Sequence, residues 1–273
     1  MRTKLISAPY TIWMTLFIIV PMGLVAFFAF TDKSGAFTLD NILRVGQYSN
    51  VFLRSIWLGA IATLISLLLG YPLAYVIAKA KPSRQSIMVM LVMLPMWMNF
   101  LLRTYAWMSL LEDNGLINNL LVSIGLPRVH MINTAGAVVL GMVYNYIPYM
   151  ILPIYSVLAK IDNSVIEAAQ DLGANDVKVF LKVVLPMSMS GVISGVTMVF
   201  VPAVSTFIIS KMLGGGGNLL IGDLIDMQFL GSAYNPNLGS AISLVLMIII
   251  MICMGIMNQF DDGEDSMGGG MIL

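Results

Sequence analysis

The sequence predicts an all-α integral membrane protein with about six transmembrane helices. Three observations support this prediction. Of its 273 residues, 59% are hydrophobic and only 10% are charged, and the mean hydropathy is +0.90. A soluble domain has roughly 25% charged residues. Several uncharged stretches reach the length of about 20 residues that is needed to cross a hydrocarbon core about 30 Å thick.

The whole chain, residues 1–273, is expected to form a single transmembrane domain. Its first apolar segment follows Arg2 and Lys4, as in a signal peptide, but it is longer than the roughly 7 to 15 apolar residues of such a peptide. We therefore expect a retained helix. The third segment contains one charged residue, Arg103. The six expected spans are residues 9–31, 55–79, 86–111, 134–159, 183–209 and 238–258.

The distribution of basic residues favours a cytoplasmic N-terminus. With that orientation the inside segments hold eight lysines and arginines and the outside segments five, and basic residues are enriched in inside loops. A net charge of zero gives no electrostatic basis for binding nucleic acid, so the expected surroundings are lipid. The single cysteine, Cys253, and the single histidine, His130, argue against a cysteine cluster or a zinc site.

The expected cytoplasmic loop at residues 160–182 differs from the spans because it is amphipathic. Ser164 followed by Glu167 matches a capping box and predicts the start of a short helix. Gly173 stands where a left-handed residue ends a helix, and Asn175 or Asp176 can cap a second one. Small apolar side chains recur at helical spacing along the first helix: Val165, Ala168, Ala169 and Leu172. This helix–turn–helix is either a docking element for another protein or a surface element whose apolar face rests on lipid.

The same loop resembles the EAA loop of ABC-importer permease subunits. Glu167-Ala168-Ala169, Gly173 and then Val183 with Leu185-Pro186 carry the resemblance. Its one departure is Val183, where isoleucine is commoner. The resemblance implies the MetI-like architecture of type I importers and a coupling helix seated on a cytosolic ATPase. The residues that it assigns to this contact are Ser164, Glu167, Ala168, Ala169, Leu172, Gly173 and Pro186.

The resemblance also implies partners. These are a second homologous permease subunit, a cytosolic ABC ATPase dimer and an extracytoplasmic substrate-binding protein, assembled in the cytoplasmic (inner) membrane of a prokaryote. The run Gly214 to Gly217 continues into Asn218 rather than lysine, so it does not match the glycine-rich sequence that cradles ATP phosphates. We therefore expect no cofactor and no enzymatic activity on this chain, with ATP and Mg²⁺ on the partner ATPase.

Two further stretches resemble the spermidine/putrescine permeases of the PotB type. One is Leu94–Trp97 with Leu102–Trp107, which includes Arg103 and Tyr105, and the other is Gly214–Asp223. They imply import of polyamines. Two alternatives stay open: an importer of another small solute, such as sulfate or ferric ion, and a stand-alone secondary transporter. The sequence shows neither the inverted repeats nor the midplane ionisable residues expected of the latter.

Arg103 is the one charged residue well inside an expected span, and such a charge is costly enough to suggest a function. One interpretation is that its long side chain reaches the outer membrane surface, or pairs with Glu112 or Asp113. The other is a gate or structural lock in which Arg103 holds loop carbonyls or acids. A direct contact with a polyamine is not expected, because like charges repel.

Aromatic residues of the fourth expected span are candidates for a cation path. On a helix Asn145 and Tyr149 share a face, and Tyr146 lies beside Tyr149, with Tyr144 next to them in sequence. Aromatic rings attract cations by about 0.5 to 2 kcal/mol each, which suits a weak transit site. The alternative is that these tyrosines pack between helices or mark the membrane interface.

In the last expected outside loop, Asp223 and Asp226 follow the glycine run Gly214 to Gly217. This loop is either a mobile gate or docking loop that attracts a polycation, or a solvated loop with charges. The acidic, glycine- and methionine-rich tail that begins at Asp261 indicates no particular function.

Overall fold

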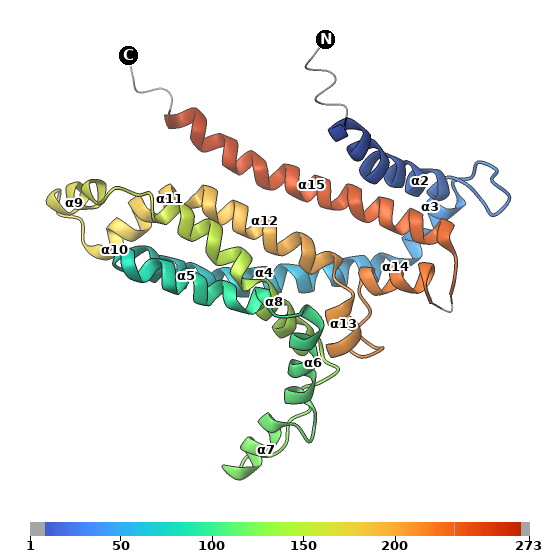
Figure 1. Cartoon of the computed structure of the whole chain (residues 1–273), viewed down its shortest axis with the longest axis horizontal. Coiled ribbons are helices and arrows are strands. Elements are labelled where there is room, and N and C mark those ends of the chain that lie inside the picture. Colours follow the sequence, from blue (N-terminus) through green and yellow to red (C-terminus); the bar gives the residue numbers. More distant parts are fainter. Residues whose placement is uncertain (1–8, 232, 269–273) are drawn as a thin grey trace.

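Helices make up almost all of the computed structural model, which describes residues 9–231 and 233–268 (Figure 1). In this part of the chain, two pairs of helices qualify as bent membrane spans. They raise the number of spans from four to six. The four single segments that are long and apolar enough to cross a membrane are Pro9–Ala29, Asp40–Lys79, Ala135–Leu158 and Pro236–Met257. The predicted all-α membrane fold is confirmed.

The helices follow one another along the chain with short connections. The first half contains a π-helical turn at Thr15–Ile19, α2 (Val20–Ala29), α3 (Asp40–Val45), a 3-10 turn at Gly46–Tyr48, α4 (Ser49–Lys79), α5 (Pro82–Trp97), α6 (Phe100–Leu111) and α7 (Leu116–Ser123). The second half contains α8 (Ala135–Leu158), α9 (Asn163–Asp171), α10 (Asp176–Val179), a π-helical turn at Phe180–Val184, α11 (Leu185–Met187), α12 (Met189–Ser205), α13 (Ile208–Leu213), α14 (Ile221–Phe229) and α15 (Pro236–Gly268). The backbone of the acidic tail continues α15, whereas Arg2 and Lys4 lie outside the described residues.

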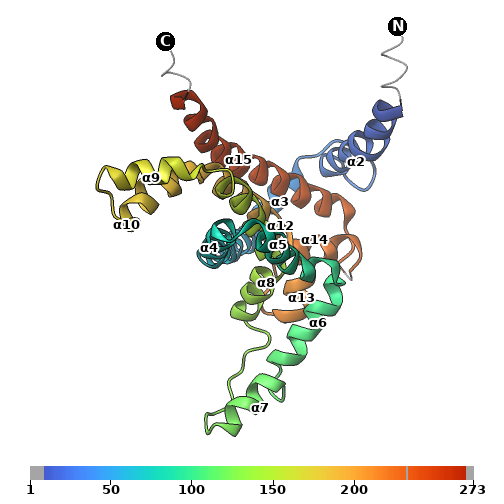
Figure 2. The ribbon, with the colours of Figure 1, turned by 60° about the vertical axis from the view of Figure 1, so that its left-hand side comes forward.

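The centre of the bundle is formed by α4, α8 and α12, which lie side by side (Figures 1 and 2). Small residues let membrane helices approach closely. A Cβ atom at Gly59 of α4 would lie 2.8 Å from Val204 Cγ2 on α12. One at Gly195 of α12 would lie 2.9 Å from Met150 Sδ on α8. A larger residue at either glycine would therefore push the central helices apart.

The first span lies at the edge of this bundle. It packs on α15 through α2, and two asparagines fix its end. Asn237 Nδ2 donates to Thr31 O at 2.8 Å, and Asn41 Nδ2 donates to the same carbonyl at 2.9 Å. Only 6% of the apolar window within Pro9–Ala29 is buried by the chain itself. Most of the surface of this span therefore faces its surroundings.

The expected span at residues 86–111 is not one straight helix. It divides into α5 and α6, and the helical segments on either side of the break are bent by 86°. Met98 and Asn99 have non-helical backbone angles, and the Asn99 side chain accepts hydrogen bonds from Leu101 N at 2.9 Å and Leu102 N at 3.3 Å. Asparagine is a preferred N-cap residue. By accepting hydrogen bonds from the free backbone N–H groups at the start of α6, Asn99 allows a new helix to begin inside an apolar stretch.

The expected span at residues 183–209 is also interrupted. Its helical segments bend by 63° at Ser188, and α12 ends at Ser205 before the extended backbone of Thr206. The coupling loop lies before α12 and the glycine run follows it. These two loops are therefore separated by the length of α12 (Figure 1).

Candidate functional site

The predicted coupling loop forms two short helices, α9 and α10, but α9 begins earlier than predicted. Its first residue is Asn163, and the Asp162 carboxylate caps it by accepting a hydrogen bond from Ser164 N at 3.0 Å. This backbone hydrogen bond lowers the pKa of Asp162. Ser164 is therefore inside the helix, and the predicted capping box of Ser164 and Glu167 is wrong.

The end of α9 agrees with the prediction. Gly173 has a φ of 83°, and Ala174 N donates to Ala169 O at 3.1 Å. This is the Schellman arrangement, in which a left-handed glycine lets the chain close over the last helical carbonyls. Asn175 then caps α10 by accepting a hydrogen bond from Lys178 N at 2.9 Å. Of the two predicted caps, the structure uses Asn175.

The apolar residues of α9 divide between two sides of the helix. Ile166 and Ala169 pack against a buried cluster of α4, α8 and α12. Val165 and Leu172 are exposed over 40% and 90% of their surfaces, and Ala168 is exposed between them. The predicted single stripe is therefore split. Three of its four members form an apolar ridge that no described residue covers.

The other coupling candidates are also accessible. Ser164, Glu167 and Gly173 are exposed on the same loop. Pro186 lies beyond α10, at the start of α11, and is exposed as well. A proline is tolerated in the first turn of a helix because it lacks a backbone donor that would be unpaired there.

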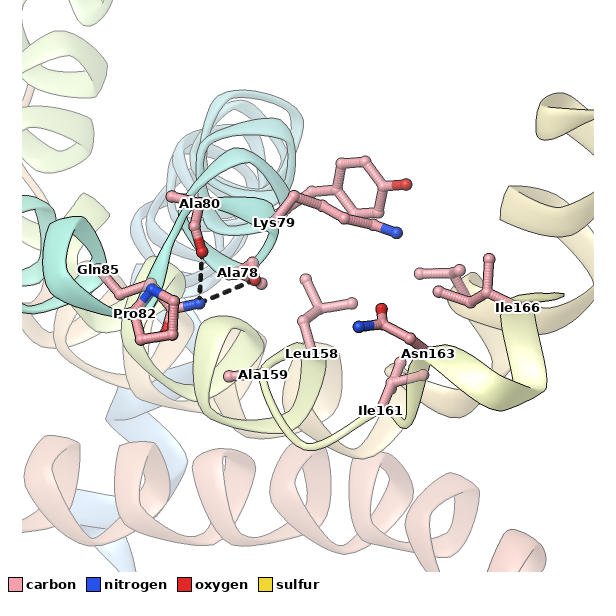
Figure 3. Close-up of a pocket in the computed structure, with 12 residues that line it drawn as sticks. Ala78, Lys79, Ala80, Pro82, Gln85, Leu158, Ala159, Ile161, Asn163 and Ile166 are labelled. Atoms are coloured by element: carbon pink, nitrogen blue, oxygen red, sulfur yellow. Dashed lines mark hydrogen bonds between the residues drawn. The ribbon is translucent and has the colours of Figure 1, made fainter.

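A cavity of about 250 Å³ lies where α9 meets the ends of α4, α5 and α8 (Figure 3). Asn163 and Ile166 line it from α9, and Lys79 lines it from α4. Gln85 of α5 closes another wall, since its Nε2 donates to Ala78 O at 3.0 Å and to Ala80 O at 2.9 Å. Part of the space between α9 and the ends of α4, α5 and α8 is therefore unfilled.

Phe180 connects the coupling loop to α4. Its ring centre lies 5.7 Å from that of Tyr71 and 5.6 Å from that of Tyr75, edge-on to both. The Tyr71 hydroxyl lies 2.8 Å from Ser188 Oγ, at the bend that precedes α12. Phe180 belongs to the predicted coupling loop, whereas Tyr71, Tyr75 and Ser188 were not predicted to take part in coupling. The available signal in the sequence is that Tyr71 and Tyr75 are four residues apart and so share a helix face.

Arg103 lies near the start of α6, just after the break, and only 7% of its surface is exposed. Its Nε and Nη1 atoms find no hydrogen-bond partner in the described part of the chain, and its guanidinium lies 5.9 Å from the centre of the Phe100 ring. Asp113 pairs with His130 at 2.8 Å. Neither the predicted pairing of Arg103 with Glu112 or Asp113 nor its predicted extension to the surface occurs within this chain, because α6 turns the side chain inward.

The candidate residues around α8 do not line one open face. Asn145 is 2% exposed and donates Nδ2 to its own helix, which leaves its Oδ1 without a partner among residues 9–231 and 233–268. Tyr144 packs edge-on against Trp107 of α6, with ring centres 5.4 Å apart. The packing interpretation therefore holds for Tyr144. Tyr149 and Tyr105 are exposed on this chain, and their role in a cation path stays a prediction.

The glycine run before α14 is held by neighbouring side chains. Asn218 Nδ2 donates to Gly214 O at 2.6 Å and to Asn133 O at 2.9 Å. Arg54 of α4 donates Nη1 to Gly217 O at 2.8 Å and also binds Asn218 Oδ1. These bonds hold both ends of the run, and a role of this loop as a gate or docking loop stays a prediction.

Asp223 and Asp226 lie on α14. Asp223 is 7% exposed, and its Oδ2 accepts a hydrogen bond from Leu220 N at 2.9 Å. Burial raises the pKa of Asp223, while the bond from Leu220 lowers it to a smaller extent. Asp226 Oδ2 binds Lys211 Nζ at 3.0 Å. Neither carboxylate belongs to a freely solvated loop, so that interpretation is wrong for both.

Comparison with known proteins agrees with this arrangement. Residues 67–262 match the family described as binding-protein-dependent transport system inner membrane component. The chain is 36% identical over 250 residues to the spermidine/putrescine transport system permease protein PotB of Haemophilus influenzae. That match covers 88% of this chain and 87% of the relative.

Two solved structures are similar in fold. One is the crystal structure of a bacterial ABC transporter involved in the import of the acidic polysaccharide alginate, with a TM-score of 0.77, 19% identity and 95% of each chain covered. The other is the MetNI methionine ABC transporter in an inward-facing conformation, with a TM-score of 0.59, 15% identity, and coverage of 78% of this chain and 93% of that one. The predicted MetI-like fold class is confirmed. The chain belongs to the family of inner membrane components of binding-protein-dependent transport systems.

Proposed function

We propose that this chain is the permease subunit of an ATP-driven importer of polyamines and forms half of its translocation pathway. Membership of the family makes it a transport subunit rather than an enzyme, so ATP hydrolysis belongs to another chain. Similarity to a spermidine/putrescine permease along 88% of the chain supports the substrate class. The structural observation that carries the coupling role is the uncovered apolar ridge of α9.

The proposed partner of this ridge is a cytosolic ABC ATPase dimer, which binds ATP and Mg²⁺. Val165, Ala168 and Leu172 offer a narrow apolar surface, and the exposed Ser164 and Glu167 offer polar contacts beside it. This proposal places α9 and the N-terminus in the cytoplasm. A second homologous permease subunit and an extracytoplasmic substrate-binding protein complete the assembly in the inner membrane.

The proposed mechanism is alternating access driven from α9. Closure of the ATPase dimer displaces α9, and Phe180 passes the displacement to Tyr71 and Tyr75 on α4. Because α4, α8 and α12 are closely packed, they move together rather than deform. The two permease subunits then reorient, and the substrate is released to the other side. No covalent chemistry occurs on this chain.

The coupling role is tested by replacing Ala168 with tryptophan in the assembled transporter. A bulky side chain in the middle of the ridge prevents close docking, so uptake should fall at least about tenfold, as for the loss of a central interface contact. The control is Ser123→Trp on α7, which is exposed outside the coupling loop. Undiminished uptake in the Ala168 variant, at equal abundance in the membrane, would exclude the proposed contact.

The substrate class is tested by uptake into proteoliposomes that contain the complete transporter. We expect ATP-dependent accumulation of radiolabelled spermidine and putrescine. Accumulation of sulfate or ferric ion in place of both polyamines would overturn the polyamine proposal and leave the coupling role intact.

A further inference from the structure

A second cavity, of about 160 Å³, lies beside α14, and we name it the α14 cavity. It lies near the C-terminal end of α12, whereas the coupling loop lies near the N-terminal end (Figure 1). Three charged side chains line it, Lys211, Asp223 and Asp226, together with the apolar side chains of Leu219 and Met227. When both carboxyl groups are ionised, the lining carries a net negative charge. A cavity of this size holds several groups as large as a water molecule.

Asp223 leaves one carboxylate oxygen unused. Its Oδ2 is engaged by Leu220 N, but its Oδ1 is buried and lacks a donor among the described residues. The Ser210 hydroxyl, which is near enough to Asp223 to lower its pKa, donates to Phe207 O at 3.0 Å. Burying a carboxylate oxygen without a hydrogen-bond donor is unfavourable. Asp223 Oδ1 therefore lacks a hydrogen-bond donor, and a cationic donor in the α14 cavity would also balance the negative charge of the carboxylates.

The chain itself shows which kind of donor the cavity accepts. Lys211 Nζ is a primary alkylammonium group, and it lies 3.0 Å from Asp226 Oδ2. The Lys211 side chain is 66% exposed and that of Asp226 only 18%, so the ammonium reaches the carboxylate from the solvent side. Methylene groups that carry such an ammonium can lie along Leu219 and Met227, as lysine stems do on apolar surfaces.

The two carboxylates of the α14 cavity suit an ammonium group better than a metal ion. Ca²⁺ takes about six to eight oxygen ligands. The described residues contain no group of three or more histidine, cysteine, aspartate or glutamate side chains that could hold a metal. Two carboxylates with an apolar wall match the charge and shape of a positively charged alkyl chain end.

We propose that the α14 cavity binds a primary alkylammonium group, with Asp223 supplying the free carboxylate oxygen and Lys211 competing with the ligand for Asp226. The identity of the ligand as a polyamine rests on the proposed function, because the ends of a polyamine are primary ammonium groups. Such a site means that the permease itself recognises the substrate, in addition to the extracytoplasmic binding protein.

The first test compares uptake kinetics in cells that express the complete transporter. Asp223→Asn keeps an oxygen for the Leu220 N–H and removes the charge. It should raise the KM for spermidine about tenfold, as for the loss of one charge-assisted hydrogen bond. Lys211→Met removes the competitor and should lower the KM. The control is Asp40→Asn, since Asp40 is an exposed acid paired with Arg44 on α3. An unchanged KM in the Asp223 variant overturns the site.

The second test separates failure of the site from failure of the proposed function. Binding of radiolabelled putrescine is measured at equilibrium on the purified full-length chain in lipid nanodiscs. The site predicts binding by the wild-type chain, tighter binding by Lys211→Met and weaker binding by Asp223→Asn. This pattern supports the site even if the transporter imports no polyamine. No binding by the wild-type chain, or equal binding by all three, overturns it. If Asp223→Asn does not fold, tighter binding by Lys211→Met supports the site and unchanged binding overturns it.

Discussion

The Tyr71 hydroxyl lies 2.8 Å from the Ser188 hydroxyl and so joins α4 to the point where the chain bends by 63° into α12. The ring of the same tyrosine contacts Phe180 at the end of the coupling loop. One side chain thus holds together a central helix, a bend and the loop proposed to receive the motion of the ATPase.

Tyr71→Phe removes this hydrogen bond and keeps the ring contact with Phe180. A neutral hydrogen bond contributes about 1 kcal/mol, so we expect uptake per ATP hydrolysed to fall about fivefold. Uptake and ATP hydrolysis are measured on the same proteoliposomes. The control is Tyr75→Phe, because the Tyr75 hydroxyl bonds to none of the described residues while its ring packs on Phe180. Equal losses in the two variants would show that the hydrogen bond has no special role.

Arg103→Met should affect the chain alone and the assembled transporter in opposite ways. Methionine fills a similar space without burying the unpaired Nε and Nη1 donors, each of which costs about 1 to 3 kcal/mol. We therefore expect the purified chain to unfold at a higher temperature in detergent, while uptake by the transporter falls. Thermal unfolding and uptake are the two measurements. A lower unfolding temperature would mean that the guanidinium already has an acceptor.

Asn218→Ala should loosen the glycine run. It removes the bonds to Gly214 O and Asn133 O and one of the two bonds from Arg54. Local opening then becomes easier, and amide hydrogen exchange across Gly214–Gly217 should accelerate at least about tenfold. Asn114→Ala serves as the control, because Asn114 is exposed and pairs with Arg128 in another loop. Exchange rates unchanged from the wild-type chain would contradict the assigned role of Asn218.

The pKa of Asp223 sets the sign of a pH effect on stability. Burial raises this pKa above the ordinary value of 3.8, and the negative charge of Asp226 acts in the same direction while Lys211 opposes it. The folded chain therefore binds this proton more tightly than the unfolded chain does. The contribution of Asp223 to stability is greatest at low pH, decreases as pH rises from 3.8 through the folded-state pKa, and is constant above it.

Asp223→Asn removes this pH-dependent contribution. The unfolding temperature of the variant minus that of the wild-type chain should therefore increase as pH rises from 3.8 through the folded-state pKa, because the wild-type carboxyl ionises there. Thermal unfolding in a single detergent across that range measures the difference. A difference that stays constant with pH would show that the carboxyl is not shifted.

Features set by local sequence were predictable. The spans follow from uncharged length, and Gly173 was identifiable because a left-handed helix end needs a residue without Cβ. The start of α9 was predicted wrongly because Asp162 and Ser164 are both good cap residues, and local preferences do not rank them. The choice depends on how the preceding turn leaves α8.

Features set by packing were not predictable in this way. Asn99 is a single polar residue in an apolar stretch, and its sequence neighbours do not show that the chain turns there by 86°. For Asp223 the sequence left a solvated loop and a gate or docking loop both open, and its neighbours in sequence do not show that α14 buries it against α13 and the glycine run. The inward direction of Arg103 follows from the same break at Asn99.

The division of α9 into two apolar sides limits how it can move. Ile166 and Ala169 face the bundle, whereas Leu172 faces outward. Neighbouring residues on an α-helix are about 100° apart around its axis, so rolling the helix to improve one contact withdraws the other. A helix held by the bundle on one side and by the proposed ATPase on the other can still tilt or slide along its axis, because the cavity beneath it leaves room. In the proposed coupling, the motion of the ATPase therefore reaches this chain as a shift along α9 or a tilt of α9, and its direction depends on which residues of α9 face the bundle.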